Sequence, residues 1–367
     1  MEVGPSRRVE NLALARDAIE INAAGRVVMP GFVDSHTHLI FPPAGIAHCD
    51  QETAARAVHT CTGQRLELRA RAYLEAMARH GTTTVEAKTG CGPDAQAETK
   101  VLRVLAALKR EPVDIVPSFL FRLPRELDRG GSFHAAADWV FSDLLPKIRK
   151  RRVACFADLA WDCDPDRYSC FTRYLDVARQ LGFACKIHSD QPSPSAAIAM
   201  ALRHRVVSID HLEYATDTEA RILADSDVMT TLLPCGSFRS GGQDAPARAL
   251  IDAGVPVALG TNFNPHRDPT LSMQTVVAIA CLRLRMTVAE AIGAATINGA
   301  HALGRADRVG SLEFGKSADL VMLNVHDYRE MEQNFGNNLV HQTMKRGEFI
   351  YKEGDVAPRA AAAVCPH

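Results

Sequence analysis

The pair His36 and His38 carries the strongest chemical signal in the sequence, within residues 30–38. Alternate residues of a β-strand face the same side, so both imidazoles, and Asp34 with them, would point together. Two imidazoles aimed inward at the end of a strand make half of a metal site. A motif this short also arises by chance, so the prediction depends on partners elsewhere in the chain.

Two further histidines end later apolar runs. His188 lies near the end of the run Ala184–Ser189, where it would supply the third nitrogen ligand of a catalytic metal site with one position open for water. His211 lies near the end of the run Val206–Leu212 and could act as a general acid or base, or polarise a carbonyl. It could also form a purely structural hydrogen-bonded pair with Asp210.

Asn262 follows the last apolar run, at a place where such a metal site would want a carboxylate. The amide oxygen of asparagine can coordinate a metal weakly, but it carries no charge and cannot act as a base near neutral pH. We therefore expect Asn262 to be a weak metal ligand that limits catalysis.

The elements that would position these residues are short, apolar, β-branched runs that alternate with longer amphipathic segments. This pattern is typical of β/α units around a parallel sheet. Eight runs favour an α/β fold of the closed (β/α)8, TIM-like barrel type over an open sheet. The runs are Val27–Leu39, Thr82–Lys88, Asp114–Leu120, Val153–Ala160, Ala184–Ser189, Val206–Leu212, Val228–Leu233 and Val255–Thr261. Helices are expected at Gln64–His80, Gln96–Lys109, Arg167–Leu181 and Thr287–Leu303.

The pattern becomes β-rich after the last predicted helix, with an apolar run at Leu320–Leu323 and a strand pair within Gln342–Tyr351. Such strands would form a small unit outside the barrel. The expected organisation is a truncated N-terminal part of a small β domain (residues 1–28), the barrel (29–305), the C-terminal part of the same composite β-sandwich (306–357) and a frayed tail (358–367).

Composition narrows the class of function. The 367 residues carry a net charge of -1, which does not favour binding to nucleic acid or to an anionic membrane. We expect no transmembrane helix, because no run of 18 or more apolar residues occurs. The ten cysteines form no C-x-x-C pair, a pattern that suits reduced thiols in a cytoplasmic protein.

Taken in order, these stretches resemble the amidohydrolase superfamily and, within it, imidazolonepropionase. The resemblance spans residues 21–354. It rests on V-M-P-G-F-V-D-S-H-T-H-L (28–39), G-T-T-T-V-E-A-K-T-G-C-G (81–92), H-S-D-Q (188–191), I-D-H-L-E (209–213), L-L-P (232–234), G-T-N-F-N-P (260–265) and G-S-L-E-F-G-K-S-A-D-L (310–320). It implies one divalent transition metal, zinc before iron, held by His36, His38, His188 and Asn262. Water activated by that metal would attack the carbonyl of a cyclic amide and open the ring.

The resemblance also implies roles for further residues. His211, Gln191 and Asn262 would be catalytic, and the substrate would be bound by Lys88, Cys91, Arg122, Asn264 and His266. The chain departs from the family at several of these places. Asn262 stands for an aspartate, Gly45 for an arginine, Cys91 for a tyrosine, Arg122 for part of an A-H pair and His266 for a glycine.

Three hypotheses remain open from the sequence. The first is a hydrolase of imidazolonepropionase type that acts on a small cyclic amide with an altered substrate preference. The second is a deaminase of the same superfamily, against which Gln191 argues, because such deaminases typically carry a glutamate there. The third is a catalytically impaired or non-catalytic relative, which Asn262 favours. A homodimer is a possible assembly.

Overall fold

The structure is a computed structural model that describes residues 3–40, 51–90, 95–108, 112–122, 137–161, 163–189, 194–265 and 267–355. Within these residues, eight strands form one parallel sheet and four form a second, antiparallel sheet. The parallel strands are β2 (Phe32–Asp34), β3 (Thr82–Lys88), β4 (Asp114–Phe121), β5 (Phe156–Ala160), β6 (Ala184–Ser189), β7 (Ser208–His211), β8 (Met229–Leu232) and β9 (Val257–Leu259). The antiparallel strands are β1 (Val27–Pro30), β10 (Leu320–Leu323), β11 (Val340–Lys345) and β12 (Glu348–Lys352).

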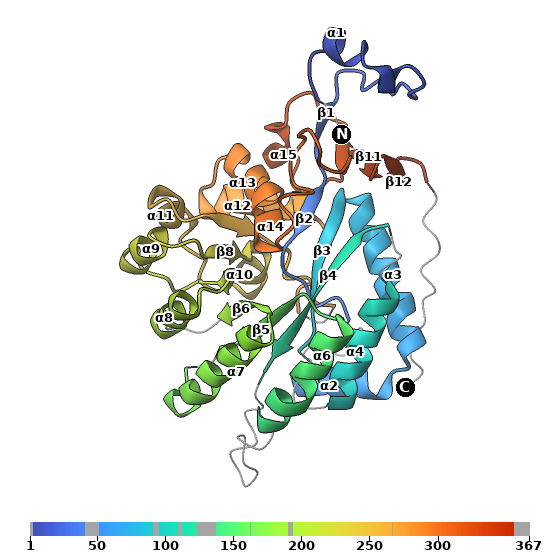
Figure 1. The fold of residues 1–367 in the computed structure, drawn as a ribbon. Helices are drawn as coiled ribbons and strands as arrows, with labels where there is room; N and C mark the ends of the chain where they lie inside the picture. Colours follow the sequence, from blue (N-terminus) through green and yellow to red (C-terminus); the bar gives the residue numbers. More distant parts are fainter. Residues whose placement is uncertain are drawn as a thin grey trace.

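Helices follow most of the parallel strands and cover the outside of their sheet (Figure 1). They are α1 (Ser6–Val9), α2 (Gln51–Thr60), α3 (Gly63–Arg79), α4 (Ala95–Ala107), α6 (Leu145–Arg151), α7 (Tyr168–Gln180), α8 (Ser195–His204), α9 (Asp217–Ala224), α10 (Pro234–Ser240), α11 (Ala247–Asp252), α12 (Met273–Leu284), α13 (Val288–Ala294), α14 (Ile297–Ala302) and α15 (Glu330–Gln333). Short 3₁₀ turns lie at Ala13–Ala15 and Pro165–Arg167, and a π-helical turn lies at Val140–Leu144.

The eight parallel strands are hydrogen-bonded in chain order, which confirms the predicted TIM-like barrel. The first and last strands approach each other just beyond their carboxyl ends, at a parallel bridge between Thr37 and Phe263. There the His38 N–H donates to the Phe263 carbonyl at 2.7 Å. The carboxyl ends of all eight strands therefore surround one opening, which is where barrel enzymes carry their active sites.

Two predicted elements are each divided in the structure. The run Val27–Leu39 divides at Gly31 between β1 of the small sheet and β2 of the barrel. A Cβ atom at Gly31 would lie 2.3 Å from the Thr83 side chain, so the crossing from one sheet to the other needs glycine. The predicted helix Thr287–Leu303 is two helices, α13 and α14, because Thr296 between them leaves the helical conformation with φ -130° and ψ -91°.

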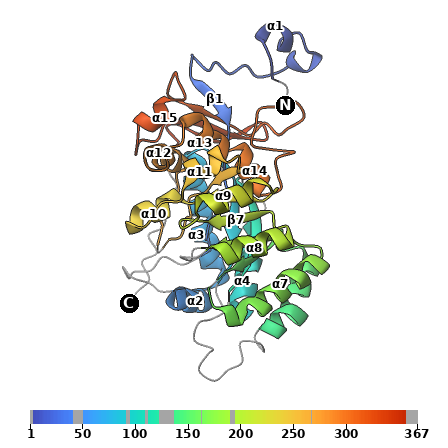
Figure 2. The ribbon, with the colours of Figure 1, turned by 90° about the vertical axis from the view of Figure 1, so that its left-hand side faces the viewer.

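The small β unit is a single four-stranded sheet in the described residues, where the sequence predicted a β-sandwich. Its strand order is β1-β10-β11-β12, so one N-terminal strand joins three C-terminal ones. The small unit is therefore composite, as predicted, and has the form of one antiparallel sheet because residues 3–26 add α1 and a 3₁₀ turn to the described structure. Figures 1 and 2 show this sheet at one end of the molecule and α2 at the other. The predicted frayed tail lies outside the described residues.

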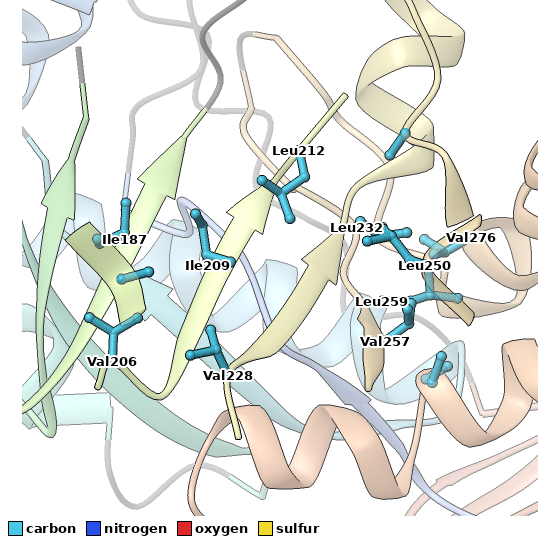
Figure 3. Close-up of a cluster of buried hydrophobic side chains, with 14 of the residues drawn as sticks. Ile187, Val206, Ile209, Leu212, Val228, Leu232, Leu250, Val257, Leu259 and Val276 are labelled. Carbon is cyan, nitrogen blue, oxygen red and sulfur yellow. The ribbon is translucent and has the colours of Figure 1, made fainter. Parts of the chain in front are cut away.

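The main hydrophobic core lies between the barrel strands and the outer helices. Ile187, Ile209, Leu232 and Leu259 project from four neighbouring strands, β6 to β9, into this layer (Figure 3). On β6 and β7 these residues alternate with polar ones: Ile187 lies between Lys186 and His188, and Ile209 between Ser208 and Asp210. The apolar side chains of these two strands therefore face the helices and the polar ones face the barrel interior. Among the described helices, none has the length and apolar character needed to cross a membrane.

Candidate metal centre

Three of the predicted histidines meet at the carboxyl end of the barrel. His36 and His38 follow β2, and His188 is the penultimate residue of β6. Each histidine offers one ring nitrogen, and these three nitrogen atoms lie within 4.8 Å of one another. The ring centroids are 5.0 Å apart for His36 and His188, 5.3 Å for His36 and His38, and 5.8 Å for His38 and His188. All three side chains are buried.

The protonation and orientation of these rings suit a divalent cation. His36 Nδ1 lies 2.8 Å from Asp210 Oδ2, and within the described residues the buried Nε2 atom of His36 has no hydrogen-bond partner. A buried polar atom without a partner is costly, and a bound metal would satisfy it. Burial, followed by nearby positive charge, holds the pKa of His36 and of His38 well below the usual range. For His188 burial is again the main cause of a low pKa. The neutral imidazole is the form that binds metals.

His211, the last residue of β7, joins the cluster as a fourth imidazole. Its ring centroid lies 4.5 Å from that of His188 and 5.5 Å from that of His36. Its Nδ1 atom lies 3.0 Å from Glu213 Oε1. The structure pairs Asp210 with His36 and His211 with Glu213, in place of the structural pair between Asp210 and His211 that the sequence left open.

The backbone at His211 is unusual. Its φ is +81°, and the next residue, Leu212, has φ +64°. Residues other than glycine rarely adopt this left-handed backbone conformation, which costs about 1–3 kcal/mol for each residue. Residues in such conformations concentrate at functional sites. The conformation turns the end of β7 so that His211 faces the other imidazoles.

Asn262 lies beside the first two histidines. Thr261 donates its hydroxyl to Asp34 Oδ2 at 2.6 Å, and the carbonyl of Phe263 accepts from the backbone of His38. Asn262 itself has φ +55° and donates Nδ2 to Asp268 Oδ2 at 2.9 Å. The structure therefore brings position 262 to the site and turns one edge of its amide toward a neighbouring carboxylate.

A network of buried charges lies beneath the histidines in the barrel interior. Its members, none of which has an exposed side chain, are Glu86, Lys88, Asp158, Lys186 and Asp210. The ammonium of Lys88 lies 2.5 Å from Asp158 and 2.9 Å from Asp210. The ammonium of Lys186 lies 2.9 and 2.8 Å from the two carboxylate oxygens of Glu86. Three carboxylates thus surround two ammonium groups.

The charges in this network stabilise one another. Burial alone would lower the pKa of Lys88, but Asp158, Asp210 and Glu86 outweigh it and raise that pKa well above its usual value. Burial would likewise raise the pKa of Asp210, but Lys186, Lys88 and the hydrogen bond to His36 hold it well below the usual range. Asp210 is therefore an ionised carboxylate bound to His36, an arrangement that fixes the tautomer of a metal-binding histidine.

This network contains one residue with a predicted role and adds residues that the sequence analysis missed. Lys88 is expected from the sequence to bind substrate, and the structure places its fully buried ammonium among the carboxylates of Glu86, Asp158 and Asp210. The sequence signal that could have revealed these residues is the alternation of charged and apolar residues along the barrel strands. Glu86 and Lys88 share one face of β3, as Lys186 and His188 share one face of β6.

The remaining predicted site residues lie around the opening or outside the described residues. Arg122 follows β4 and is half-buried, close enough for its charge to lower the pKa of His38 and His188 after the larger effect of burial. Asn264 exchanges two backbone hydrogen bonds of 2.9 Å with Asp268 in the loop after β9. Gln191, Cys91 and His266 lie outside the described residues.

Comparison with known proteins supports the resemblance to the amidohydrolases that the sequence motifs indicate. The profile of the amidohydrolase family matches residues 172–350. Imidazolonepropionase of Porphyromonas gingivalis is 36% identical over 350 residues, which cover 90% of this chain and 83% of that protein. Imidazolonepropionase of Geobacillus kaustophilus is 37% identical over 363 residues, which cover 93% of this chain and 84% of that protein.

Solved structures share the fold at lower identity. A triazine hydrolase variant superposes with a TM-score of 0.77 at 18% identity, covering 93% of this chain and 87% of its own. A 5-methylcytosine deaminase from Klebsiella pneumoniae superposes with a TM-score of 0.73 at 18% identity, covering 92% and 89%. Since relatives that share more than a third of their residues with it match nine-tenths of its length, the chain belongs to the amidohydrolase superfamily, in which it resembles the imidazolonepropionases.

Proposed function

We propose that this protein is a metal-dependent hydrolase that opens a cyclic amide by cleaving a carbon–nitrogen bond, and that its metal is zinc, with iron as the second candidate. The observation that supports this proposal is that ring nitrogens of His36, His38 and His188, one from each, lie within 4.8 Å of one another. Three neutral nitrogen ligands with an open fourth position are typical of catalytic zinc sites. Asn262 would lie at the edge of that site.

A divalent metal held there would supply a Lewis acid that lowers the pKa of water and polarises a carbonyl. The residues of the chain would orient the metal-binding rings and move protons to or from the substrate. Asp210 holds the Nδ1 edge of His36, which would leave Nε2 as the atom that could bind the metal. Glu213 holds the Nδ1 edge of His211, which makes Nε2 the atom that can exchange a proton with the substrate or polarise its carbonyl.

We propose further that the substrate carries an acidic group bound by Arg122. After the larger effect of burial, the positive charges of Arg122 and Arg267 lower the pKa of His38, and that of Arg122 also lowers the pKa of His188. A charge-assisted pair between arginine and a carboxylate is worth about 1.5–3 kcal/mol. Because Gly45 and Cys91 stand where the family has arginine and tyrosine, imidazolone propionate itself should be a poor substrate.

Metal content is the first test. Protein purified without chelators should contain about one zinc or iron ion per chain, and His36→Ala or His188→Ala should lose it. His326→Ala, an exposed histidine of the small sheet region, is the matched control and should retain it. A metal content near zero that added zinc and iron do not restore would refute the proposal.

Substrate class is the second test. A panel of cyclic amides with and without a carboxylate should show ring opening, with preference for the acids and slow turnover of imidazolone propionate. Arg122→Met should raise KM for the acids about tenfold or more and leave KM for uncharged amides unchanged. Release of ammonia from aminopurines without ring opening would indicate a deaminase. Bound metal without turnover of either class would indicate the non-catalytic relative.

A further inference from the structure

The loop after β9 is hydrogen-bonded, on both sides of Asn262, to the end of β2 and the segment that follows it. Before it, the backbone and hydroxyl of Thr261 donate to the two carboxylate oxygens of Asp34 at 3.0 and 2.6 Å. After it, the carbonyl of Phe263 accepts from the His38 N–H at 2.7 Å. Residue 262 therefore has little freedom to move away from the site.

Asp268 is held directly behind Asn262. Its carboxylate accepts the 2.9 Å hydrogen bond from Asn262 Nδ2, and its side chain is buried with its residue 9% exposed. The turn that carries it is closed by the reciprocal backbone hydrogen bonds between Asn264 and Asp268. A Cβ atom at Gly236 would lie 3.2 Å from Asn262 Nδ2, so the glycine leaves room for the half-buried amide.

This hydrogen bond decides which way the amide faces. Nδ2 is used by Asp268, so the oxygen Oδ1 lies on the opposite edge of the same planar group. An amide whose N–H donates to a carboxylate has a more electron-rich oxygen, because hydrogen-bonded groups polarise one another. A carboxylate that is one hydrogen bond away can therefore act on a cation through the amide between them.

We propose that Asp268 is a positioning residue of the metal site: acting through Asn262, it supplies the negative charge that position 262 itself lacks. Resting on the proposed function, this inference adds a residue to the site. Three neutral imidazoles leave the charge of a divalent cation uncompensated on the loop side, and Asp268 is a buried carboxylate already joined to that side. The pair Asn262 and Asp268 would then do together what a single carboxylate ligand does elsewhere.

The decisive variant exchanges the two residues. Asn262→Asp combined with Asp268→Asn keeps the composition, the net charge and a hydrogen bond between the two positions, but it moves the carboxylate next to the metal. Zinc affinity of the full chain would be measured by competition with a chromophoric chelator, independently of any substrate. We expect Asp268→Asn alone to bind zinc about 10–100-fold more weakly than the wild type, and the exchanged pair to bind at least as tightly as the wild type.

Controls separate charge from folding. Asp307→Asn removes one negative charge at an exposed site and should leave zinc affinity unchanged. Asn262→Ala keeps Asp268 but removes the amide that connects it, so it should weaken zinc binding as Asp268→Asn does. Thermal unfolding of each metal-free protein would identify variants that fail to fold. If Asp268→Asn fails to fold, the zinc affinity of the exchanged pair is compared directly with that of the wild type.

Zinc affinity of Asp268→Asn within twofold of the wild type would overturn this inference and leave the proposed function standing. The inference would also fail if the exchanged pair bound as weakly as Asp268→Asn, because Asp268 would then serve the loop and not the metal. A wild-type protein that binds no zinc or iron would instead refute the proposed function, and the inference with it.

Discussion

At the scale of single residues, the site depends on charges that no solvent reaches. His36 is the member of the cluster that joins the metal-binding face to the ion network, through its 2.8 Å contact with Asp210. Asp210 in turn lies 2.9 Å from the ammonium of Lys88. A change in the barrel interior should therefore alter metal binding at the opening.

Asp210→Asn tests this connection. The variant keeps the shape of the side chain but removes the charge that fixes the His36 ring and neutralises Lys88. We expect zinc affinity to fall about 10–100-fold and the free energy of unfolding to fall by about 3–5 kcal/mol, because a buried ion pair loses one partner. Competition with a chelator and urea unfolding measure the two effects.

Ser208→Ala is the matched control for that variant. The Ser208 hydroxyl donates to the other oxygen of the same carboxylate, Asp210 Oδ1, at 2.9 Å. Its loss should cost about 1 kcal/mol of stability and leave zinc affinity within about twofold. If both variants lowered zinc affinity equally, the charge of Asp210 would not be what orients His36.

At the scale of elements, close contacts between helices and strands hold the barrel around the site. Helix α14 packs against β2, the strand that leads to His36 and His38, and Gly299 of α14 lies close to Val33 of β2. A Cβ atom at Gly299 would lie 2.8 Å from the carbonyl oxygen of Val33. Glycine is required there by the packing of one backbone on another and not by its own φ angle.

Two glycine substitutions in neighbouring helices should have opposite effects on stability. Gly299→Ala should lower the free energy of unfolding by about 1–3 kcal/mol, because the new methyl group pushes α14 away from β2. Gly293→Ala in α13 meets no atom within 4 Å and should raise it by about 1 kcal/mol through helix propensity. Urea unfolding of both variants gives the comparison. Equal effects of the same sign would show that α14 does not press on β2.

At the scale of the whole molecule, the small sheet is bound to the amino-terminal end of the barrel, opposite the site. Lys345 of β11 makes the connection. Its ammonium lies 2.5 Å from Asp319, just before β10, and 2.8 Å from Asp114, the first residue of β4. The side chains of Lys345 and Asp319 are each 2% exposed, so the pair is buried between the two sheets.

Lys345→Met tests whether the two sheets unfold together. The variant leaves the Asp319 carboxylate buried without its ammonium partner, and we expect a loss of about 3–5 kcal/mol in the free energy of unfolding. The exposed Lys147, paired with Asp143 on α6 and its preceding turn, is the control. Lys147→Met should change stability by no more than about 1 kcal/mol. Zinc affinity should be unchanged in both, since neither residue is near the histidines.

The sequence by itself determined the features that depend on local periodicity. Apolar runs of period two separated by helical segments predict the eight barrel strands, because side-chain alternation is a property of the strand alone. The same alternation puts His36 and His38 on one face, and it places His188 and His211 near the ends of their strands. The position of these residues at one opening follows from the parallel arrangement of the strands.

Only the tertiary structure decided which polar residues pair across the barrel. His36 and Asp210 are 174 residues apart, and Lys186 and Glu86 are 100 apart. No local pattern records such contacts, because they depend on strand register and on how far each side chain reaches into the interior. The same holds for the division of residues 27–39 between two sheets at Gly31 and for the turn that brings Asp268 to Asn262. These long-range contacts form only when the barrel closes.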